Sequence, residues 1–249
     1  TNVLGTVRVL EAVRETPSAR AVLVVTSDKV YVNDGSGRSF REDDRLGGGD
    51  PYSSSKACQE IVAACYRENF FTASHPRVAV ARAGNVIGGG DWAADRLVPD
   101  FVRAAASAQS LVLRHPEATR PWQHVLDPLA GYLIYIERLF AADGDGLPAA
   151  LNFGPPAASV QPVGRVVDAL AERWGGGVSW KKTDAAPAPE ATALALDASL
   201  ARRSLGWRPR LDFAQALDWT AAWYRAHCEG RDMRAYSLDE LRRYAGLSG

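Results

Sequence analysis

The sequence predicts an α/β fold built on an open, mainly parallel sheet. Short runs of aliphatic and β-branched residues alternate along the chain with longer segments whose apolar residues recur at helical spacing. Strands that alternate with helices form βα units, in which successive strands run parallel. In such sheets, ligands bind beyond the carboxyl ends of the strands. Three predicted strands are followed there by polar or glycine-rich segments, at residues 26–29, 84–91 and 154–155.

The first expected elements are a helix over residues 1–13 and a buried strand, Ala-Val-Leu-Val-Val, over residues 21–25. Residues 34–50 are rich in glycine, serine and charge, which indicates a loop. Asp50-Pro51 then begins a helix over residues 52–70, because aspartate suits a helix cap and proline suits the first turn. The other expected strands cover residues 77–82, 111–114, 151–154 and 178–181. The other expected helices cover residues 97–106, 126–140, 163–174, a segment near residue 200, 213–227 and 238–244. A Pro/Ala linker is expected at 185–191.

Composition and charge exclude several classes of protein. The 249 residues include 29 basic and 29 acidic side chains, so the formal net charge is zero and no basic surface for nucleic acid is indicated. No apolar run is long enough to span a bilayer, and there is no signal-peptide pattern. The three cysteines are odd in number and lack the spacing of metal ligands. We therefore expect no bound metal and a reducing, cytoplasmic environment.

Tyr52 and Lys56 lie four residues apart on the helix expected after Pro51, so they share one face. A lysine ammonium beside a tyrosine favours the phenolate, which can take a proton from an alcohol near neutral pH. The spacing alone is common, and a surface tyrosine beside a solvated lysine is the alternative. Only four of the 29 basic residues are lysine, and Lys29 and Lys56 are two of them. Because a lysine amine can lose its proton and arginine cannot, this usage favours a chemical role for both.

Several stretches of the sequence resemble the extended short-chain dehydrogenase/reductase family. The resemblance is carried by a strand that ends in Thr-Ser-Asp-Lys, followed by Pro-Tyr-Ser-Ser-Ser-Lys and then by Arg-Ala-Gly-Asn. Within that family the chain is most similar to the CDP-glucose 4,6-dehydratase branch, and the similarity covers nearly its whole length. The matching stretches are residues 25–31, 50–56, 82–92, 120–129, 196–197, 205–209 and 230–234.

This resemblance implies a Rossmann-like, doubly wound parallel sheet that lacks its N-terminal strands, with a smaller C-terminal α/β part that binds the substrate. Residues 1–95 would be the C-terminal portion of the NAD-binding domain. Residues 96–249 would mainly bind the sugar nucleotide, with residues 126–154 returning to the sheet. Family members hold the NAD pyrophosphate on a glycine-rich turn at a helix N-terminus. This sequence has no G-x-G-x-x-G turn and begins inside an expected helix, so we expect the family's first strands to be missing.

The resemblance also implies roles for the first strand end and the following helix. Tyr52 would deprotonate the sugar 4-hydroxyl while C4 gives hydride to NAD, and Lys56 would lower the pKa of Tyr52 and bind the nicotinamide ribose. Ser27 would hydrogen-bond the same sugar oxygen, with a simple turn hydroxyl as the alternative. Asp28 would be the acid at the C6 hydroxyl, which requires a raised pKa. Lys29 would be the base at C5 or would stabilise the enolate, and a local ion pair with Asp28 is the alternative.

Four further positions match ligand contacts of the family. Asn85 would contact the sugar nucleotide, with an asparagine in a turn as the alternative. Arg120 and Arg96 would hold the diphosphate, because guanidinium groups match phosphate oxygens, although most arginines in this chain are expected to be solvated. Asn2 would lie beside the cofactor, but an asparagine at a helix start can also be a cap.

The implied activity is the NAD-dependent 4,6-dehydration of a nucleotide-activated glucose, with CDP-glucose as the expected substrate, in deoxysugar biosynthesis. Two alternatives stay open. An epimerase or reductase of the same family would use Tyr52 and Lys56 without any need for Asp28 and Lys29. A fragment without its own glycine-rich turn could instead bind a sugar nucleotide without catalysis. Because family members commonly associate through the tyrosine helix and its neighbour, we expect a homodimer or homotetramer.

Overall fold

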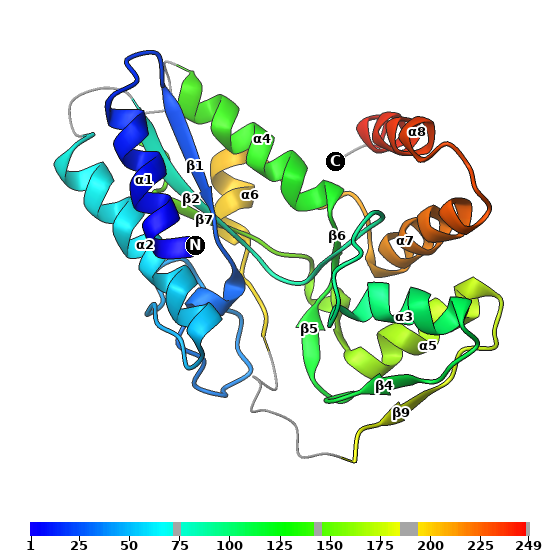
Figure 1. The fold of residues 1–249 in the computed structure, drawn as a ribbon. Helices are drawn as coiled ribbons and strands as arrows, with labels where there is room; N and C mark the ends of the chain where they lie inside the picture. Colours follow the sequence, from blue (N-terminus) through cyan, green and yellow to red (C-terminus); the bar gives the residue numbers. More distant parts are fainter. Residues whose placement is uncertain (72–75, 142–145, 185–193, 248–249) are drawn as a thin grey trace. The chain divides into compact units, whose positions relative to one another are not determined.

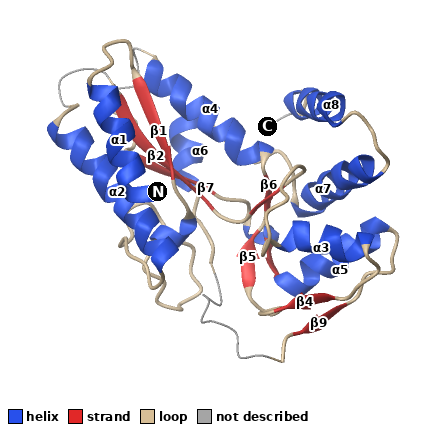
Figure 2. Cartoon of the chain, viewed as in Figure 1, coloured by secondary structure: helices blue, strands red, loops and turns tan. Residues whose placement is uncertain are grey.

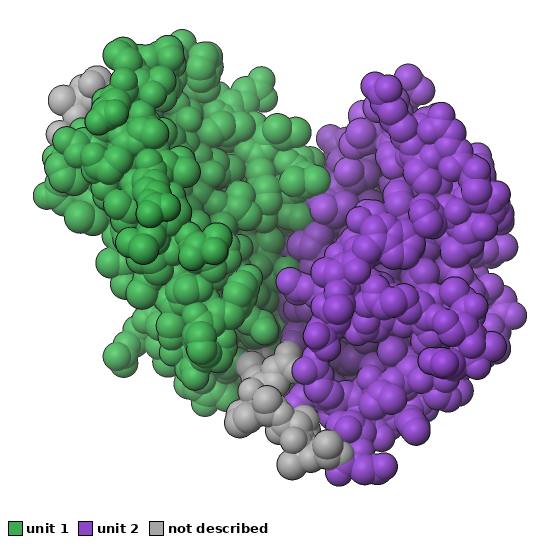
Figure 3. Space-filling model, viewed as in Figure 1, with its two compact units in different colours: residues 1–84, 128–154, 194–208 green, residues 85–127, 155–193, 209–249 purple. Residues whose placement is uncertain are grey.

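The computed structural model describes residues 1–71, 76–141, 146–184 and 194–247. The chain divides into two compact units, which are coloured green and purple in Figure 3. Unit 1 comprises Thr1–Gly84, Pro128–Gly154 and Leu194–Arg208, and unit 2 comprises Asn85–Asp127, Pro155–Ala193 and Pro209–Gly249. Each unit has a hydrophobic core of its own.

Unit 1 is built on a three-stranded parallel sheet in the order β1-β2-β7 (Figure 1). These strands are β1 (Ala21–Val25), β2 (Arg77–Ala83) and β7 (Ala150–Phe153). Val25 pairs with Ala81, and Ala83 pairs with Phe153, so the carboxyl ends of the three strands lie along one edge. Among the described residues β1 pairs with β2 alone, which leaves its other side without a strand.

Helices cover both faces of this sheet (Figure 2). They are α1 (Asn2–Arg14) and α2 (Pro51–Asn69) on one face, and α4 (Leu126–Phe140) and α6 (Ser199–Leu205) on the other. The first face buries Leu10, Val24, Ala63, Tyr66, Val78 and Val80. The second face buries Ala79, Ala81, Tyr135, Leu139, Leu151, Phe153, Ala198, Ala201, Leu205 and Trp207. Successive residues of β2 thus serve opposite faces, as the pleat of a strand requires, and the whole strand is apolar apart from its arginines.

In its described residues, unit 2 combines three pairs of short strands with four α-helices. The strand pairs are β3 (Val86–Ile87) with β6 (Gln123–His124), β4 (Leu111–Leu113) with β9 (Trp180–Lys182), and β5 (Thr119–Pro121) with β8 (Val160–Pro162). The helices are α3 (Leu97–Ala106), α5 (Val163–Trp174), α7 (Phe213–Cys228) and α8 (Met233–Ala245). Their apolar faces enclose one core that includes Phe101, Leu170 and Leu217.

The predicted α/β fold with a parallel sheet is confirmed, and the expected helices and strands are present, some with the expected bounds and others with shifted ends. The helix expected from residue 238 begins earlier, at Met233, because the Asp232 carboxylate accepts hydrogen bonds from the Arg234 and Ala235 backbone amides. Four short strands were not expected: β3, β5, β6 and β8. The Pro/Ala linker expected at 185–191 lies outside the described residues.

The division into units differs from the expected ranges in three places, of which the shift of one boundary from residue 126 to Pro128 is small. Residues 85–95 belong to unit 2, because β3 pairs with β6 directly after Asn85. Residues 194–208 belong to unit 1, because Trp207 packs against Phe153 with ring centroids 5.0 Å apart. No helix in the described ranges combines the length and the apolar composition that crossing a membrane requires.

Candidate active site

The end of β1 presents the first group of candidate catalytic side chains. The backbone amide of Thr26 donates to the Ala81 carbonyl at 2.8 Å, which continues the sheet hydrogen bonds one residue beyond the strand. A short 3-10 turn, Asp28–Val30, follows directly. The Ser27 hydroxyl accepts from the Lys29 amide at 3.2 Å and donates to the Asp28 carboxylate at 3.0 Å. Ser27 and Asp28 are buried, at 8% and 3% exposure, so the carboxyl group has little access to water.

The start of α2 positions Tyr52. Asp50 caps this helix, since its carboxylate accepts from the Ser53 backbone amide at 3.0 Å, and Pro51 occupies the first turn. The two hydrogen bonds from Ser53 hold the pKa of Asp50 below its ordinary value, and nearby Lys29 lowers it further. Tyr52 therefore stands on a fixed first turn with its side chain 46% exposed.

Lys56 connects α2 to the end of β1. Its amine donates to the Val25 carbonyl at 3.3 Å and to the Gln59 side chain at 3.1 Å. Partial burial lowers the pKa of Lys56, which favours its neutral form more than in water. The Lys29 amine lies 5.9 Å from the centre of the Tyr52 ring. Unit 1 thus brings the candidate residues of the strand end and of the helix together around one strand terminus.

Asn2 lies next to the same helix turn. Its side-chain amide donates to the Ser55 hydroxyl at 2.9 Å, and that hydroxyl donates to the Tyr52 carbonyl at 2.7 Å. The cap position of α1 is Thr1, so the Asn2 side chain links two helices and does not cap its own.

The candidate substrate residues Asn85, Arg96 and Arg120 all lie in unit 2. Asn85 is half-buried, and its carbonyl accepts from the Gln123 amide at 3.1 Å. Arg120, on β5, is 3% exposed and donates to the Thr119 carbonyl at 2.8 Å. Arg96 is exposed at the start of α3 and makes no side-chain cap there. Their proposed contacts with substrate remain predictions.

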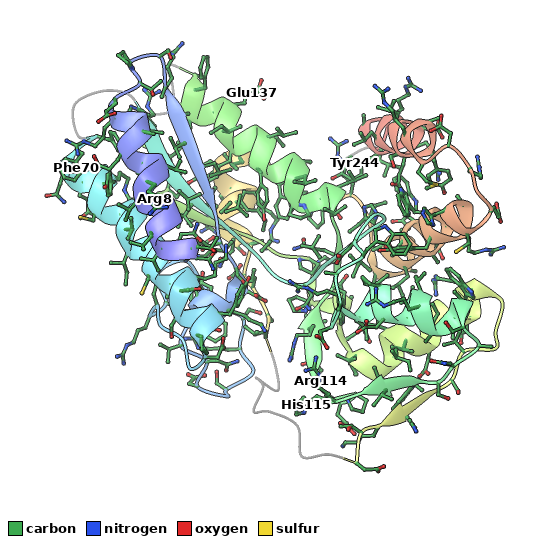
Figure 4. The ribbon with its side chains drawn as sticks, viewed as in Figure 1. Arg8, Phe70, Arg114, His115, Glu137 and Tyr244 are labelled. Carbon is green, nitrogen blue, oxygen red and sulfur yellow. The ribbon has the colours of Figure 1, made fainter. Side chains whose placement is uncertain are left out.

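Sequence reasoning missed a buried polar network behind the strand ends. Glu60 and Arg82 form an ion pair inside unit 1, and Thr26, Tyr31 and Asn152 are hydrogen-bonded to it or to one another. One signal was available, because Arg82 lies in an otherwise apolar strand and a buried charge needs a partner. Figure 4 draws the side chains on the ribbon, with Phe70 marking the end of α2.

The described part of the chain contains no cluster of three or more His, Cys, Asp or Glu side chains able to hold a metal ion. The side chains at the end of β1 include a phenol, a carboxyl group and amines, which can transfer protons. A parallel sheet with such a strand end and an adjacent Tyr-x-x-x-Lys helix defines a protein of the short-chain dehydrogenase/reductase class.

Comparison with known proteins agrees with this class. Residues 1–147 match the model of the NAD dependent epimerase/dehydratase family, and the chain belongs to that family. It is 41% identical to a CDP-glucose 4,6-dehydratase from Salmonella typhimurium, over 98% of this chain and 69% of that protein. It is 29% identical to a dTDP-glucose 4,6-dehydratase from Streptomyces griseus, over 91% of this chain and 65% of that protein.

Among solved structures, the chain is similar to a dTDP-glucose 4,6-dehydratase from Bacillus anthracis in complex with NAD. The TM-score is 0.76 at 26% identity, and the match covers 93% of this chain and 69% of the other. The chain thus spans about two thirds of the length of these relatives.

Proposed function

We propose that this chain supplies the catalytic residues for 4,6-dehydration of a nucleotide-activated glucose, with CDP-glucose as the substrate and NAD as the cofactor. The observation that carries the proposal is the convergence on one strand end of Tyr52 and Lys56 from α2 with Ser27, Asp28 and Lys29 from the segment after β1. The 41% identity to a CDP-glucose 4,6-dehydratase supports this choice of substrate over other sugar nucleotides.

The first step requires a base for the 4-hydroxyl of the sugar. Tyr52 takes that proton, and its exposed position on the first turn of α2 leaves the phenol oxygen accessible to a ligand. Lys56 carries the neighbouring positive charge, which stabilises the phenolate, and its attachment to the Val25 carbonyl holds the amine in place. Ser27 donates a hydrogen bond to the 4-oxygen and orients it.

The second step removes water across C5 and C6. A ketone at C4 makes the C5 proton acidic. Lys29 accepts this proton if the amine is neutral, or assists its removal by stabilising the enolate. Asp28 gives a proton to the departing C6 hydroxyl, so that it leaves as water. The burial of Asp28 suits this role, because a low-dielectric site disfavours the ionised carboxylate.

NAD, when bound, would supply the acceptor for the C4 hydride and its return to C6. With the proton removed from C5 also given back to C5, the net reaction is the loss of one water molecule. The residues present fit the nicotinamide end of this cofactor. Lys56 is a half-buried amine four residues after Tyr52 on α2, and Asn2, at the start of α1, donates to Ser55 on the same stretch of α2. The sequence contains no G-x-G-x-x-G turn for the pyrophosphate. We therefore assign only the nicotinamide ribose to residues of this chain.

For the assembly we propose a homodimer or homotetramer that forms through α1 and α2. The support is a set of large apolar side chains that these helices expose, with Leu4 at 66%, Val9 at 58% and Ile61 at 60%. A cytoplasmic location would suit the three exposed, unpaired cysteines. Sedimentation of the wild-type chain and of Val9→Asp tests the interface, and identical monomeric behaviour of the two would contradict it.

The test of the activity is mass spectrometry of CDP-glucose incubated with the chain and NAD. We expect a product lighter by one water, without accumulation of NADH. Accumulated NADH without water loss would contradict the dehydratase assignment and indicate an oxidoreductase of the same family. An unchanged substrate would show that this chain alone does not perform the reaction.

A further inference from the structure

We propose that the buried ion pair of Glu60 and Arg82 positions the segment Ser27–Val30 against the helix that carries Tyr52 and Lys56. This inference rests on the proposed function, because it explains how Asp28 and Lys29, the proposed acid and base for water loss, are held in position relative to Tyr52. Neither member of the pair needs to touch the substrate. Both are therefore positioning residues.

The pair is joined by three hydrogen bonds and is buried. The Arg82 Nε donates to both carboxylate oxygens of Glu60, at 2.8 and 3.0 Å, and its Nη2 also donates to Oε2. Their side chains are each 4% exposed. A two-pronged contact of this kind fixes orientation as well as distance. Glu60 lies one helical turn beyond Lys56 on α2, and Arg82 lies near the end of β2, so the pair locks helix to sheet behind the site.

The same pair holds the candidate catalytic segment at both of its ends. Before the segment, the Thr26 hydroxyl donates to Glu60 Oε1 at 2.6 Å. After the segment, Arg82 Nη1 donates to the Tyr31 hydroxyl at 2.7 Å, and that hydroxyl donates to the Asn152 side chain at 2.7 Å. Tyr31 also stacks on Phe40 with ring centroids 5.0 Å apart. Burial raises the pKa of Tyr31, which keeps its phenol neutral and able to make both bonds.

The segment needs such anchors because its own turn is weakly bonded. The Val30 amide donates to the Ser27 carbonyl at 3.3 Å, and the Tyr31 amide donates to the Asp28 carbonyl at 3.4 Å. Backbone hydrogen bonds in proteins are usually about 2.9–3.0 Å long. Two backbone bonds of 2.8 Å, from the Thr26 amide to the Ala81 carbonyl and from the Gly47 amide to the Val30 carbonyl, hold the backbone at the two ends. The side-chain bonds of Thr26 and Tyr31 add to them and tie the segment to the ion pair.

This geometry predicts that the two half-reactions respond differently when one anchor is removed. Tyr52 and Lys56 stay on an intact helix, so oxidation at C4 loses only the orienting hydrogen bond from Ser27 and slows less than water loss does. Asp28 and Lys29 are no longer held at a fixed position relative to Tyr52. A misplacement of about 1 Å can cost on the order of 100-fold in rate. In Tyr31→Phe and Thr26→Val, we expect the rate of water loss to fall by about 10-fold or more. NADH should then accumulate within a single turnover, while the KM for the sugar nucleotide stays nearly unchanged.

Matched variants separate positioning from stability. Tyr66→Phe removes a tyrosine hydroxyl that donates to Glu11 on the surface of unit 1, and Thr220→Val removes a buried hydroxyl that donates to the Ala216 carbonyl in unit 2. Neither bond touches the network, so neither control should accumulate NADH. If the controls and the anchor variants accumulate NADH alike, or if none does, the proposal is overturned.

Hydrogen–deuterium exchange tests the anchoring without any substrate or cofactor. In the full chain, amides 27–30 should exchange roughly fivefold faster or more in Tyr31→Phe and Thr26→Val than in the wild type, with the controls unchanged. Unchanged exchange in the anchor variants overturns the proposal. If the wild-type chain does not dehydrate CDP-glucose, the proposed function fails, and this exchange experiment still decides whether the ion pair holds the segment.

Discussion

The Lys56 amine donates a hydrogen bond of 3.3 Å to the carbonyl of Val25, the last residue of β1. This bond joins two motifs that are separated by 31 residues in the sequence. It places a partly buried amine between the tyrosine helix and the strand end that carries Ser27 and Asp28. The expected effects of changing Tyr52 and Asp28 depend on this arrangement.

Tyr52→Phe should lower kcat for water loss by about 100-fold or more, because general base catalysis typically contributes this much. The thermal midpoint should change little, since the Tyr52 side chain is 46% exposed and Asp50 still caps the helix. Product formation followed by mass spectrometry, together with a thermal melt, checks both expectations. A variant with wild-type kcat would remove Tyr52 from the mechanism.

Asp28→Asn should abolish water loss and leave oxidation at C4 in place. The amide has nearly the shape of the carboxyl group, so the bond from Ser27 can persist, but it cannot protonate the departing hydroxyl. A single-turnover measurement of NADH absorbance, combined with product analysis, separates the two steps. If water loss also survives, the chain is an epimerase or reductase of the family and not a dehydratase.

The stability of unit 2 should fall as the pH is lowered from about 6.5 to about 4 because of His124. This residue is 1% exposed, and burial lowers its pKa from 6.5 to about 4. Between these pH values the unfolded chain binds a proton at His124 and the folded chain does not. The contribution of His124 to the free energy of unfolding is therefore fully present above the unfolded pKa and is lost as the pH falls toward the folded pKa. The two pKa values differ by about 2.5, which corresponds to about 3 kcal/mol at most.

Urea unfolding of the wild type and of His124→Gln at several pH values measures this effect. Carboxylates titrate in both proteins, so the difference between the two curves isolates the histidine. His124 accepts a 3.4 Å bond from the Leu126 amide, which a glutamine can replace in part. Parallel curves for the two proteins would show that His124 does not stay neutral in the fold.

Gly89→Ala should destabilise unit 2 by about 1–3 kcal/mol, the usual cost of forcing extra volume into a packed site. A Cβ at this position would lie 2.0 Å from the ring of Trp223, a buried residue of α7. Gly5→Ala on α1 is the matched control, because a Cβ there meets nothing within 4 Å. We expect that control to be neutral or stabilising, since alanine favours a helix. Equal melting temperatures of the two variants would contradict the contact.

The long elements of this fold could be predicted because their signals are local. The apolar run Ala21–Val25 and the capped helix that starts at Pro51 are read from adjacent residues. Two-residue strands such as Val86–Ile87 and Gln123–His124 carry no periodicity, and each exists only because the other lies beside it. The Tyr52–Lys56 pair was predicted from helical spacing, and the helix found there confirms that spacing.

The sequence by itself determined the fold class, the helix that carries Tyr52 and Lys56, and the family, because periodicity, caps and motifs are properties of neighbouring residues. Only the tertiary structure decided how the candidate catalytic segment Ser27–Val30 is held. The bonds from Thr26 to Glu60 and from Arg82 to Tyr31 span 34 and 51 residues. A buried charge must find its partner in space, and no local pattern states which residue that partner is.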